Sequence, residues 1–412
     1  MSGALEPPPL RRSHRFLQEL GLPPFRERLP WLGADLQTLR DTFHPPRLPV
    51  DRGLPLELPV GPLPCRMPAA GATAPAAAAD TAPAGVPDDR LLALLDHPSG
   101  GRPPRALVLL LHGLGGSSDR EGLRRLGLAL QAAGFAVLRL NLRGAGPGRH
   151  LAPGTYAARC SSDLLPVIAQ ARGLAQELGR AAAAGPLGGR PLPLLGAGIS
   201  LGGTMLLNAC LDGAEGTAAG GAAGGAAVFD GLVCVSSPLD LGACSRCIER
   251  PRNRLYQNWL LQRLCHQTLE DPVGVSPQER EQLEGTGRCR TIRSFDAAIT
   301  APRWGFASVE HYYAAASPLP RLLEGAPALP PTLLVHALDD PWVPVEAARR
   351  VAALQQPGLP VVLTARGGHN GFHGWGDPRR DPVAASWGDQ VAVGWLLRLL
   401  QMGPEATDSA RA

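Results

Sequence analysis

The sequence predicts an α/β fold in which a mostly parallel sheet carries helices on both faces and a helical cap insertion. Short, continuous apolar runs such as Ala106–Leu111 are typical of strands that are buried on both faces of a parallel sheet. Helical patterns alternate with these runs, which is the order expected of strand–helix–strand units. A long, polar and mostly helical stretch at about 240–318 interrupts the alternation, and we interpret it as the cap.

Composition limits the class of protein. The 412 residues allow one large α/β domain or two ordinary ones, and the 44% hydrophobic content supports a sizeable core. The 40 basic and 36 acidic residues are balanced and scattered, so we expect no nucleic-acid partner. The basic residues are all arginines, which excludes Schiff-base and P-loop chemistry that needs a lysine. No secretory signal or bilayer-length apolar run is visible, so we expect no integral membrane segment and a cytoplasmic location.

Changes in composition divide the chain into segments. Residues 61–89 are of low complexity and rich in Ala, Pro and Gly, which is typical of a linker or a long insert. A second Ala/Gly-rich stretch, 211–228, predicts a disordered loop insert. The expected segments are a Pro-rich N-terminal segment that docks on the core (1–60), the linker or insert (61–89), the main domain with its cap (90–402) and a disordered tail (403–412).

The elements of the main domain follow from their local patterns. An antiparallel strand is expected first, and the later apolar runs are expected to pair in parallel. The expected strands are Leu91–Leu95, Ala106–Leu111, Phe135–Leu140, Leu192–Leu195, Gly231–Val235, Thr332–Val335 and Pro360–Leu363. The expected helices are a short one within Pro30–Leu39, one capped by Asp119 with Leu123, Leu126 and Leu130 on one face, Leu164–Leu178 ended by Gly179, one after Ser200, and Val383–Leu400.

The strongest functional signal is the pentapeptide Gly198–Gly202, which has the pattern G-x-S-x-G. It follows an apolar strand and precedes a helical pattern, so Ser200 is expected on a sharp strand-to-helix turn with its hydroxyl projecting from the sheet. Side chains at the two flanking positions would collide in such a turn, which explains both glycines. We interpret Ser200 as a nucleophile.

A serine nucleophile needs a base and an acid that orients the base. Asp340 closely follows the Thr332–Val335 strand and His369 closely follows the Pro360–Leu363 strand, so both are expected at the sheet edge where Ser200 emerges. We predict that His369 is the base and Asp340 the acid. Asp339 is the alternative acid, and His373 is the alternative base.

Two backbone N–H groups are expected to bind the oxyanion. Leu201 follows the nucleophile at a helix start, and the loop His112–Gly116 follows a buried strand. We predict that the N–H groups of Leu201 and Leu114 form the oxyanion hole, with Gly113 as the alternative to Leu114. His112 is interpreted as a residue that orders the loop.

The lone pair Cys244 and Cys247 lacks the second pair of a zinc ribbon, so we expect no metal and no cofactor.

Taken together, these motifs resemble the α/β-hydrolases, and finer features resemble the YheT-like family of predicted esterases and its eukaryotic ABHD-type relatives. The resemblance implies an eight-stranded α/β-hydrolase sheet and a serine carboxylesterase or lipase-like enzyme that cleaves acyl esters of short to medium chain. It also implies the triad Ser200, Asp340 and His369. The stretches that carry it are Trp31 with Leu36–Thr38, His112–Ser118, Asn141–Gly144, Ser200–Gly203, Ser294–Pro302, Gly305–Phe306, Tyr312–Tyr313, Asp339–Pro341 and Gly368–Phe372.

Two other functions fit the same residues. The triad could transfer the acyl group to an alcohol, and His266 with Asp271 has the H-x4-D spacing of some acyltransferases, although we interpret this match as chance. The fold could also serve as a non-catalytic binding protein. The sequence leaves the oligomeric state open.

The cap residues expected to form an apolar acyl pocket are Trp259, Leu260, Leu261, Trp304 and Phe306.

Overall fold

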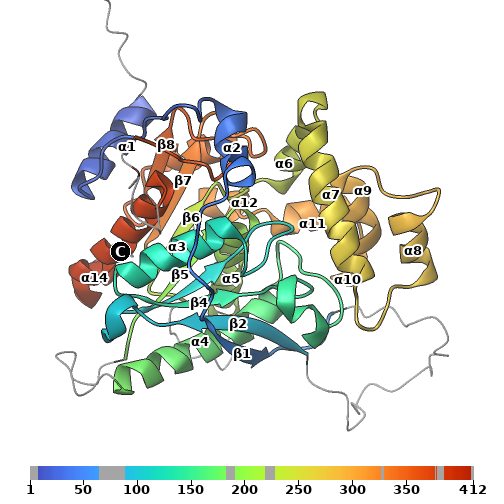
Figure 1. The fold of residues 1–412 in the computed structure, drawn as a ribbon, viewed down its shortest axis with the longest axis horizontal. Coiled ribbons are helices and arrows are strands. Elements are labelled where there is room, and N and C mark those ends of the chain that lie inside the picture. Colours follow the sequence, from blue (N-terminus) through green and yellow to red (C-terminus); the bar gives the residue numbers. More distant parts are fainter. Residues whose placement is uncertain are drawn as a thin grey trace, which may run out of the picture.

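An eight-stranded sheet forms the centre of the protein (Figure 1). The computed structural model describes residues 8–64, 89–181, 191–218, 228–325, 329–375, 377 and 385–409. The strands are β1 Leu54–Pro59, β2 Arg90–Asp96, β3 Leu107–Leu111, β4 Ala136–Leu140, β5 Leu194–Ile199, β6 Gly231–Val235, β7 Thr332–Ala337 and β8 Val361–Thr364. Their order in the sheet is β1-β2-β4-β3-β5-β6-β7-β8. The pairs β1–β2 and β2–β4 are antiparallel, and the other five pairs are parallel.

Helices cover both faces of this sheet, because alternate strand residues face two different apolar cores. On β3, Leu107, Leu109 and Leu111 join one core, whereas Val108 and Leu110 join the other. The first core includes α4 and α5, and the second includes α1, α3 and α14. This arrangement confirms the predicted fold class. The helices outside the cap are α1 Pro8–Glu19, α2 Ala34–Phe43, α3 Glu121–Ala132, α4 Ser161–Ala181, α5 Leu201–Ala218, α13 Glu346–Leu354 and α14 Trp387–Ser409, with 3-10 turns η1 Ser99–Gly101 and η2 Gly146–Leu151.

A set of helices after β6 forms the cap, at the right of the sheet in Figure 1. It contacts the loop after β4: the Trp304 indole N–H donates to the Thr155 carbonyl at 2.8 Å, and the Gly154 N–H donates to the Asp271 carboxylate at 2.8 Å. The cap elements are α6 Leu241–Ile248, η4 Pro251–Asn253, α7 Arg254–Leu269, α8 Pro277–Glu284, α9 Ile292–Phe295, the π-helical turn η5 Asp296–Thr300, α10 Ala301–Arg303, α11 Val309–Ala316 and α12 Leu319–Leu323.

Several expected helix limits are wrong. Asp119 does not cap α3, which begins at Glu121 after Arg120. Gly179 does not end α4, because the flanking helix formers outweigh one glycine and the helix continues to Ala181. Likewise, α5 runs to Ala218 and α14 to Ser409, so 211–218 and 403–409 are helical where disorder was expected. The rest of the 211–228 insert, apart from Val228, and most of the 61–89 linker lie outside the described residues.

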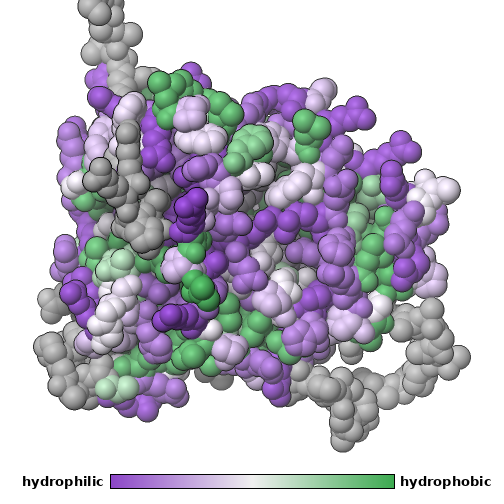
Figure 2. Space-filling model, viewed as in Figure 1, coloured by the Kyte–Doolittle hydropathy of each residue, from purple (hydrophilic) through white to green (hydrophobic). Residues whose placement is uncertain are grey.

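The Pro-rich N-terminal segment contributes a strand and two helices. The strand β1 was missed because Pro55 and Pro59 interrupt its pattern, and proline is tolerated here because β1 is an edge strand. Figure 2 shows a mostly hydrophilic face with hydrophobic patches, one of them near α2, where Leu29, Leu32 and Leu36 are exposed. None of the described helices is long and apolar enough to cross a membrane.

Arg143 joins distant parts of the chain at the end of β4. Its guanidinium group is fully buried and donates to the Asp163 carboxylate at 2.8 and 2.7 Å and to Asp89 at 2.6 Å. It also donates to the carbonyl groups of Gly61 and Pro153. A buried charge is tolerated only when such partners replace water.

We predict that Arg143→Met lowers the free energy of unfolding by about 3–5 kcal/mol, because it leaves two buried carboxylates without their cation. Urea unfolding followed by tryptophan fluorescence measures this loss. The matched control is Arg90→Met, since Arg90 forms an exposed pair with Glu57 and its loss should cost less than about 1 kcal/mol. Equal losses in the two variants would contradict the prediction.

Candidate active site

Ser200 lies on a sharp turn between β5 and α5. Its φ of 54° is in the left-handed region, which a serine adopts only when its surroundings enforce it. The turn has no room for side chains at the neighbouring glycines. A Cβ at Gly198 would lie 2.4 Å from the Gly203 backbone, and one at Gly202 would lie 2.6 Å from the His112 carbonyl oxygen. The expected reason for both glycines is therefore confirmed. Gly203 is also crowded, but by the side chains of Ser237 and Cys234.

The structure brings the three predicted triad residues together. Nε2 of His369 lies 2.9 Å from Oγ of Ser200, and Nδ1 of His369 lies 2.8 Å from Oδ2 of Asp340. The other oxygen of Asp340 accepts the backbone N–H groups of Trp342 and Val343 at 2.8 and 2.9 Å. Asp340 is completely buried and His369 nearly so. This chain of hydrogen bonds can draw a proton from the serine hydroxyl.

The alternative acid, Asp339, has a different place. Its carboxylate accepts the N–H of Gly368 at 3.0 Å, one residue before the candidate base, so it orders the loop that carries His369. The Trp342 ring stacks on the His369 ring with centroids 4.4 Å apart and planes 30° apart. Asp339 and Trp342 therefore restrict the loop and the ring of the candidate base.

The loop after β3 lies against Ser200. A Cβ on Gly113 would come within 2.9 Å of Cβ of Ser200. Two N–H groups of this loop are already used: Gly115 donates to the Tyr156 hydroxyl at 2.6 Å, and Gly116 donates to the Gly113 carbonyl at 3.1 Å. The candidates that remain for the oxyanion are those of Leu114 and Gly113, as the sequence predicts. The role of Leu114 and Leu201 as an oxyanion hole stays a prediction.

His112 orders this loop, as expected. The Leu142 N–H donates to Nε2 of His112 at 3.3 Å, so Nδ1 carries the ring proton and donates to the Gly113 carbonyl at 2.8 Å. Burial lowers the pKa of His112 to about 4, so the ring is neutral at neutral pH.

Ser200 and His369 open into a cavity of about 580 Å³, a volume typical of small-molecule sites. Trp259 and Leu260 line it as expected, but Leu261, Trp304 and Phe306 pack in apolar cores of the cap and the main domain instead. The apolar side chains that line the cavity include Leu114, Leu241, Ile248, Leu264, Ile292 and Phe295. The described residues contain no group of three or more His, Cys, Asp or Glu that could hold a metal ion.

The helix α2 supports the loop that carries His369, a role that the sequence did not indicate. The N–H of His369 donates to Oγ1 of Thr38 at 2.9 Å. Gln37 holds the same loop at two points: its Oε1 accepts the His373 N–H at 2.8 Å and its Nε2 donates to the His373 carbonyl at 3.0 Å. Gly371 packs so closely that a Cβ would lie 2.5 Å from the Gln37 carbonyl oxygen. Leu36–Thr38 carries the family resemblance, which was the one signal that pointed to these residues.

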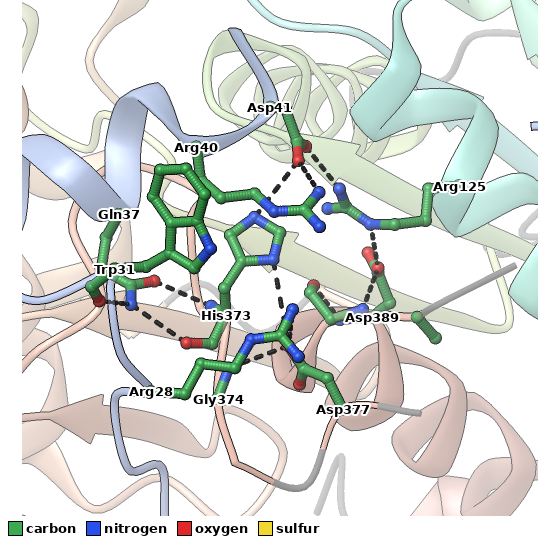
Figure 3. Close-up of polar contacts among 12 residues, drawn as sticks. Arg28, Trp31, Gln37, Arg40, Asp41, Arg125, His373, Gly374, Asp377 and Asp389 are labelled. Carbon is green, nitrogen blue, oxygen red and sulfur yellow. Dashed lines mark hydrogen bonds and ion pairs between the residues drawn. The ribbon is translucent and has the colours of Figure 1, made fainter. Parts of the chain in front are cut away.

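His373, the alternative base, is buried away from Ser200 in a network of charged residues (Figure 3). Its Nε2 lies 3.4 Å from the Asp41 carboxylate, which also pairs with Arg125 of α3. Arg125 donates in turn to Asp389 of α14 at 2.6 Å. Burial and the charge of Arg125 hold the pKa of His373 well below its usual range, so the ring is neutral. This network joins α2, α3 and α14, and its residues Asp41, Arg125 and Asp389 also line the cavity.

The two residues of the H-x4-D motif, His266 and Asp271, lie in different environments. His266 is exposed and lies 3.4 Å from the Glu270 carboxylate. Asp271 is buried, accepts an N–H from Arg303 at 3.1 Å and lies 3.1 Å from Arg149. Asp271 thus fastens the cap to the core, and the motif forms no site of its own.

The fold and the strand–turn–helix serine define an α/β-hydrolase. The chain belongs to the alpha/beta hydrolase family, whose profile matches residues 108–393.

Its relatives include esterases and phospholipases. It is 32% identical over 274 residues to the putative esterase YheT of Escherichia coli (strain K12), a match that covers 66% of this chain and 71% of that protein. It is 30% identical over 268 residues to the phospholipase ABHD3 of Homo sapiens, which covers 65% of this chain and 59% of the human protein. Among solved structures, a putative hydrolase from Agrobacterium vitis S4 has a TM-score of 0.46 at 13% identity, and it covers 85% of this chain and 100% of the other.

We predict that Thr38→Val lowers kcat for a small ester about tenfold with little change in KM, because it removes the acceptor that holds the His369 backbone. Steady-state kinetics with a p-nitrophenyl ester measures both constants. Thr286→Val, in an exposed turn of the cap, is the matched control. A Thr38→Val enzyme with unchanged kcat would show that α2 does not position the base.

The raised pKa of Asp296 predicts that the free energy of unfolding depends on pH. Its buried carboxyl accepts hydrogen bonds from Thr300 and Tyr313, yet burial raises its pKa from 3.8 to about 6. The folded protein therefore binds this proton more tightly than the unfolded chain does. The resulting stabilisation is present below about pH 4 and is lost as the pH rises to about 6.

We therefore expect the stability of the wild type to fall by about 3 kcal/mol relative to Asp296→Asn between about pH 4 and pH 7. Urea unfolding at a series of pH values measures the difference. The control is Asp119→Asn, since Asp119 is exposed. Parallel pH curves for the wild type and Asp296→Asn would contradict the prediction.

Proposed function

We propose that this protein is a serine hydrolase that cleaves carboxylic esters of short to medium acyl chain. The observation that carries the proposal is the hydrogen-bonded series Asp340–His369–Ser200, with distances of 2.8 and 2.9 Å, at the wall of a largely apolar cavity. The relatives named as a putative esterase and a phospholipase support the same class of reaction. The apolar lining supports an acyl chain as the part of the substrate that enters the cavity.

The proposed reaction has two steps. Nε2 of His369 accepts the hydroxyl proton of Ser200 as Oγ attacks the ester carbonyl, and Asp340 holds the ring tautomer that leaves Nε2 free to accept it. The N–H groups of Leu201 and Leu114 bind the developing oxyanion. His369 then donates the proton to the leaving alcohol, which gives an acyl-enzyme on Ser200. Water, activated by the same ring, hydrolyses this ester and restores the serine.

We predict that Ser200→Ala lowers kcat about 10⁶-fold and that Asp340→Asn lowers it about 10⁴-fold, because the first lacks the nucleophile and the second stabilises the wrong tautomer. Hydrolysis of p-nitrophenyl esters of increasing acyl length measures both losses and the preferred chain.

A fluorophosphonate probe tests the nucleophile without a substrate. It should label the wild type and not Ser200→Ala, whereas Ser276→Ala, at the start of α8, should be labelled like the wild type. Labelling of Ser200→Ala at the wild-type level would refute the assignment. Product analysis in the presence of an alcohol distinguishes hydrolysis from acyl transfer.

A further inference from the structure

Three arginines line the cavity that contains Ser200, and two of them, Arg120 and Arg263, lie against the same tryptophan ring. Arg120 lies directly before α3, and Arg263 lies on α7 of the cap. Both guanidinium groups lie against the ring of Trp259, at 5.5 and 5.2 Å from its centroid. The main domain and the cap therefore contribute one cation each to the same part of the cavity wall.

Neither arginine has a carboxylate partner among the residues that the structure describes. Arg125, which also lines the cavity, differs in this respect because it pairs with Asp41 and Asp389. Burial and the charge of Arg120 lower the pKa of Arg263, and the opposing effects of Tyr156 and Glu121 are weaker. The face of Trp259 offsets only part of this repulsion, since a cation–π contact contributes modestly. An anion between the two guanidinium groups would neutralise them.

Arg263 contacts the loop that lies beside Ser200, which brings the pair of arginines close to the candidate nucleophile. Its Nε donates to the Gly115 carbonyl at 2.8 Å, so the guanidinium group lies on the loop that also carries Gly113 and Leu114. Gly113 packs against Cβ of Ser200. An anionic group held by the arginines would therefore lie one short loop away from the nucleophile, within reach of an ester bound there.

We propose that Arg120 and Arg263 form an anion subsite that holds a phosphate group on the alcohol portion of the ester substrate. The proposal rests on the proposed esterase function and specifies its substrate class. The planar guanidinium fork is suited to phosphate oxygens, and the outer nitrogens of Arg263 remain available after Nε binds Gly115. The acyl chain is then assigned to the apolar wall that includes Leu264 and Phe295, and the charged alcohol to the arginines.

Two substrates that share an acyl chain test this subsite: 1-octanoylglycerol and 1-octanoylglycerol 3-phosphate. The measured quantity is the ratio of kcat/KM for the phosphate ester to kcat/KM for the neutral ester. We expect Arg120→Gln and Arg263→Gln each to lower this ratio at least about tenfold, as the loss of a charge-assisted hydrogen bond would. The matched control is Arg280→Gln on α8, since Arg280 is exposed and paired with Glu284, and its ratio should equal that of the wild type.

The ratio of the two kcat/KM values distinguishes a loss of phosphate recognition from a displacement of the loop after β3. Loss of the bond between Arg263 and Gly115 could displace the loop, but that would reduce the hydrolysis of both esters alike and leave the ratio unchanged. Arg120→Gln provides a second variant that leaves this bond intact. Unchanged ratios in both variants would overturn the proposal.

Calorimetry with inactive Ser200→Ala makes the test independent of catalysis. The phosphate ester should bind at least about tenfold more tightly to Ser200→Ala than to the same protein with Arg120→Gln added. Inorganic phosphate should bind more weakly than the phosphate ester, and equal binding would assign the arginines to free phosphate and overturn the substrate assignment. Arginine-dependent binding in a protein that hydrolyses neither ester would support the subsite and refute the esterase function.

Discussion

The left-handed backbone of Ser200 is the constraint on which the rest of the candidate site depends. This conformation points Oγ out of the sheet, and it is held because the Ser200 N–H donates to the Val235 carbonyl at 2.8 Å while the Gly203 N–H donates to the Ser200 carbonyl at 3.0 Å. Glycines at 198 and 202 let neighbouring backbones approach closely enough to enforce it. The close packing of the turn thus determines where an ester carbonyl can meet the serine.

The candidate base, His369, meets this serine because the helix α2 holds its loop. Thr38 and Gln37 satisfy backbone groups of His369 and His373, and the contact is close because Gly371 leaves no side chain between the loop and α2. The charged network around Asp41 then fastens α2 to α3 and α14. A segment that looks like a Pro-rich extension is in this way part of the site, and its loss would free the loop of the candidate base.

Local patterns predicted most of the sheet and the residues at its edge. Buried strands such as β3 were recognised because an apolar run of this kind is stable only between two layers of helices. Ser200, Asp340 and His369 were found because their loops directly follow strands or a strand-to-helix turn. The strand β1 and the full length of α5 were missed, because proline and glycine weaken local signals that pairing and packing later override.

By itself, the sequence determined most strands and helices of the main domain, the turn at Ser200 and the candidate nucleophile, since each depends on contacts between near neighbours in the chain. It limited the candidate acid and the candidate base to two residues each. Only the tertiary structure decided which partners meet over long distances. It separated the role of Asp339 from that of Asp340, placed His373 in a buried network and left Arg120 and Arg263 together without a carboxylate partner among the described residues. Such choices depend on shape and charge between elements that are far apart in the sequence, and no local pattern records them.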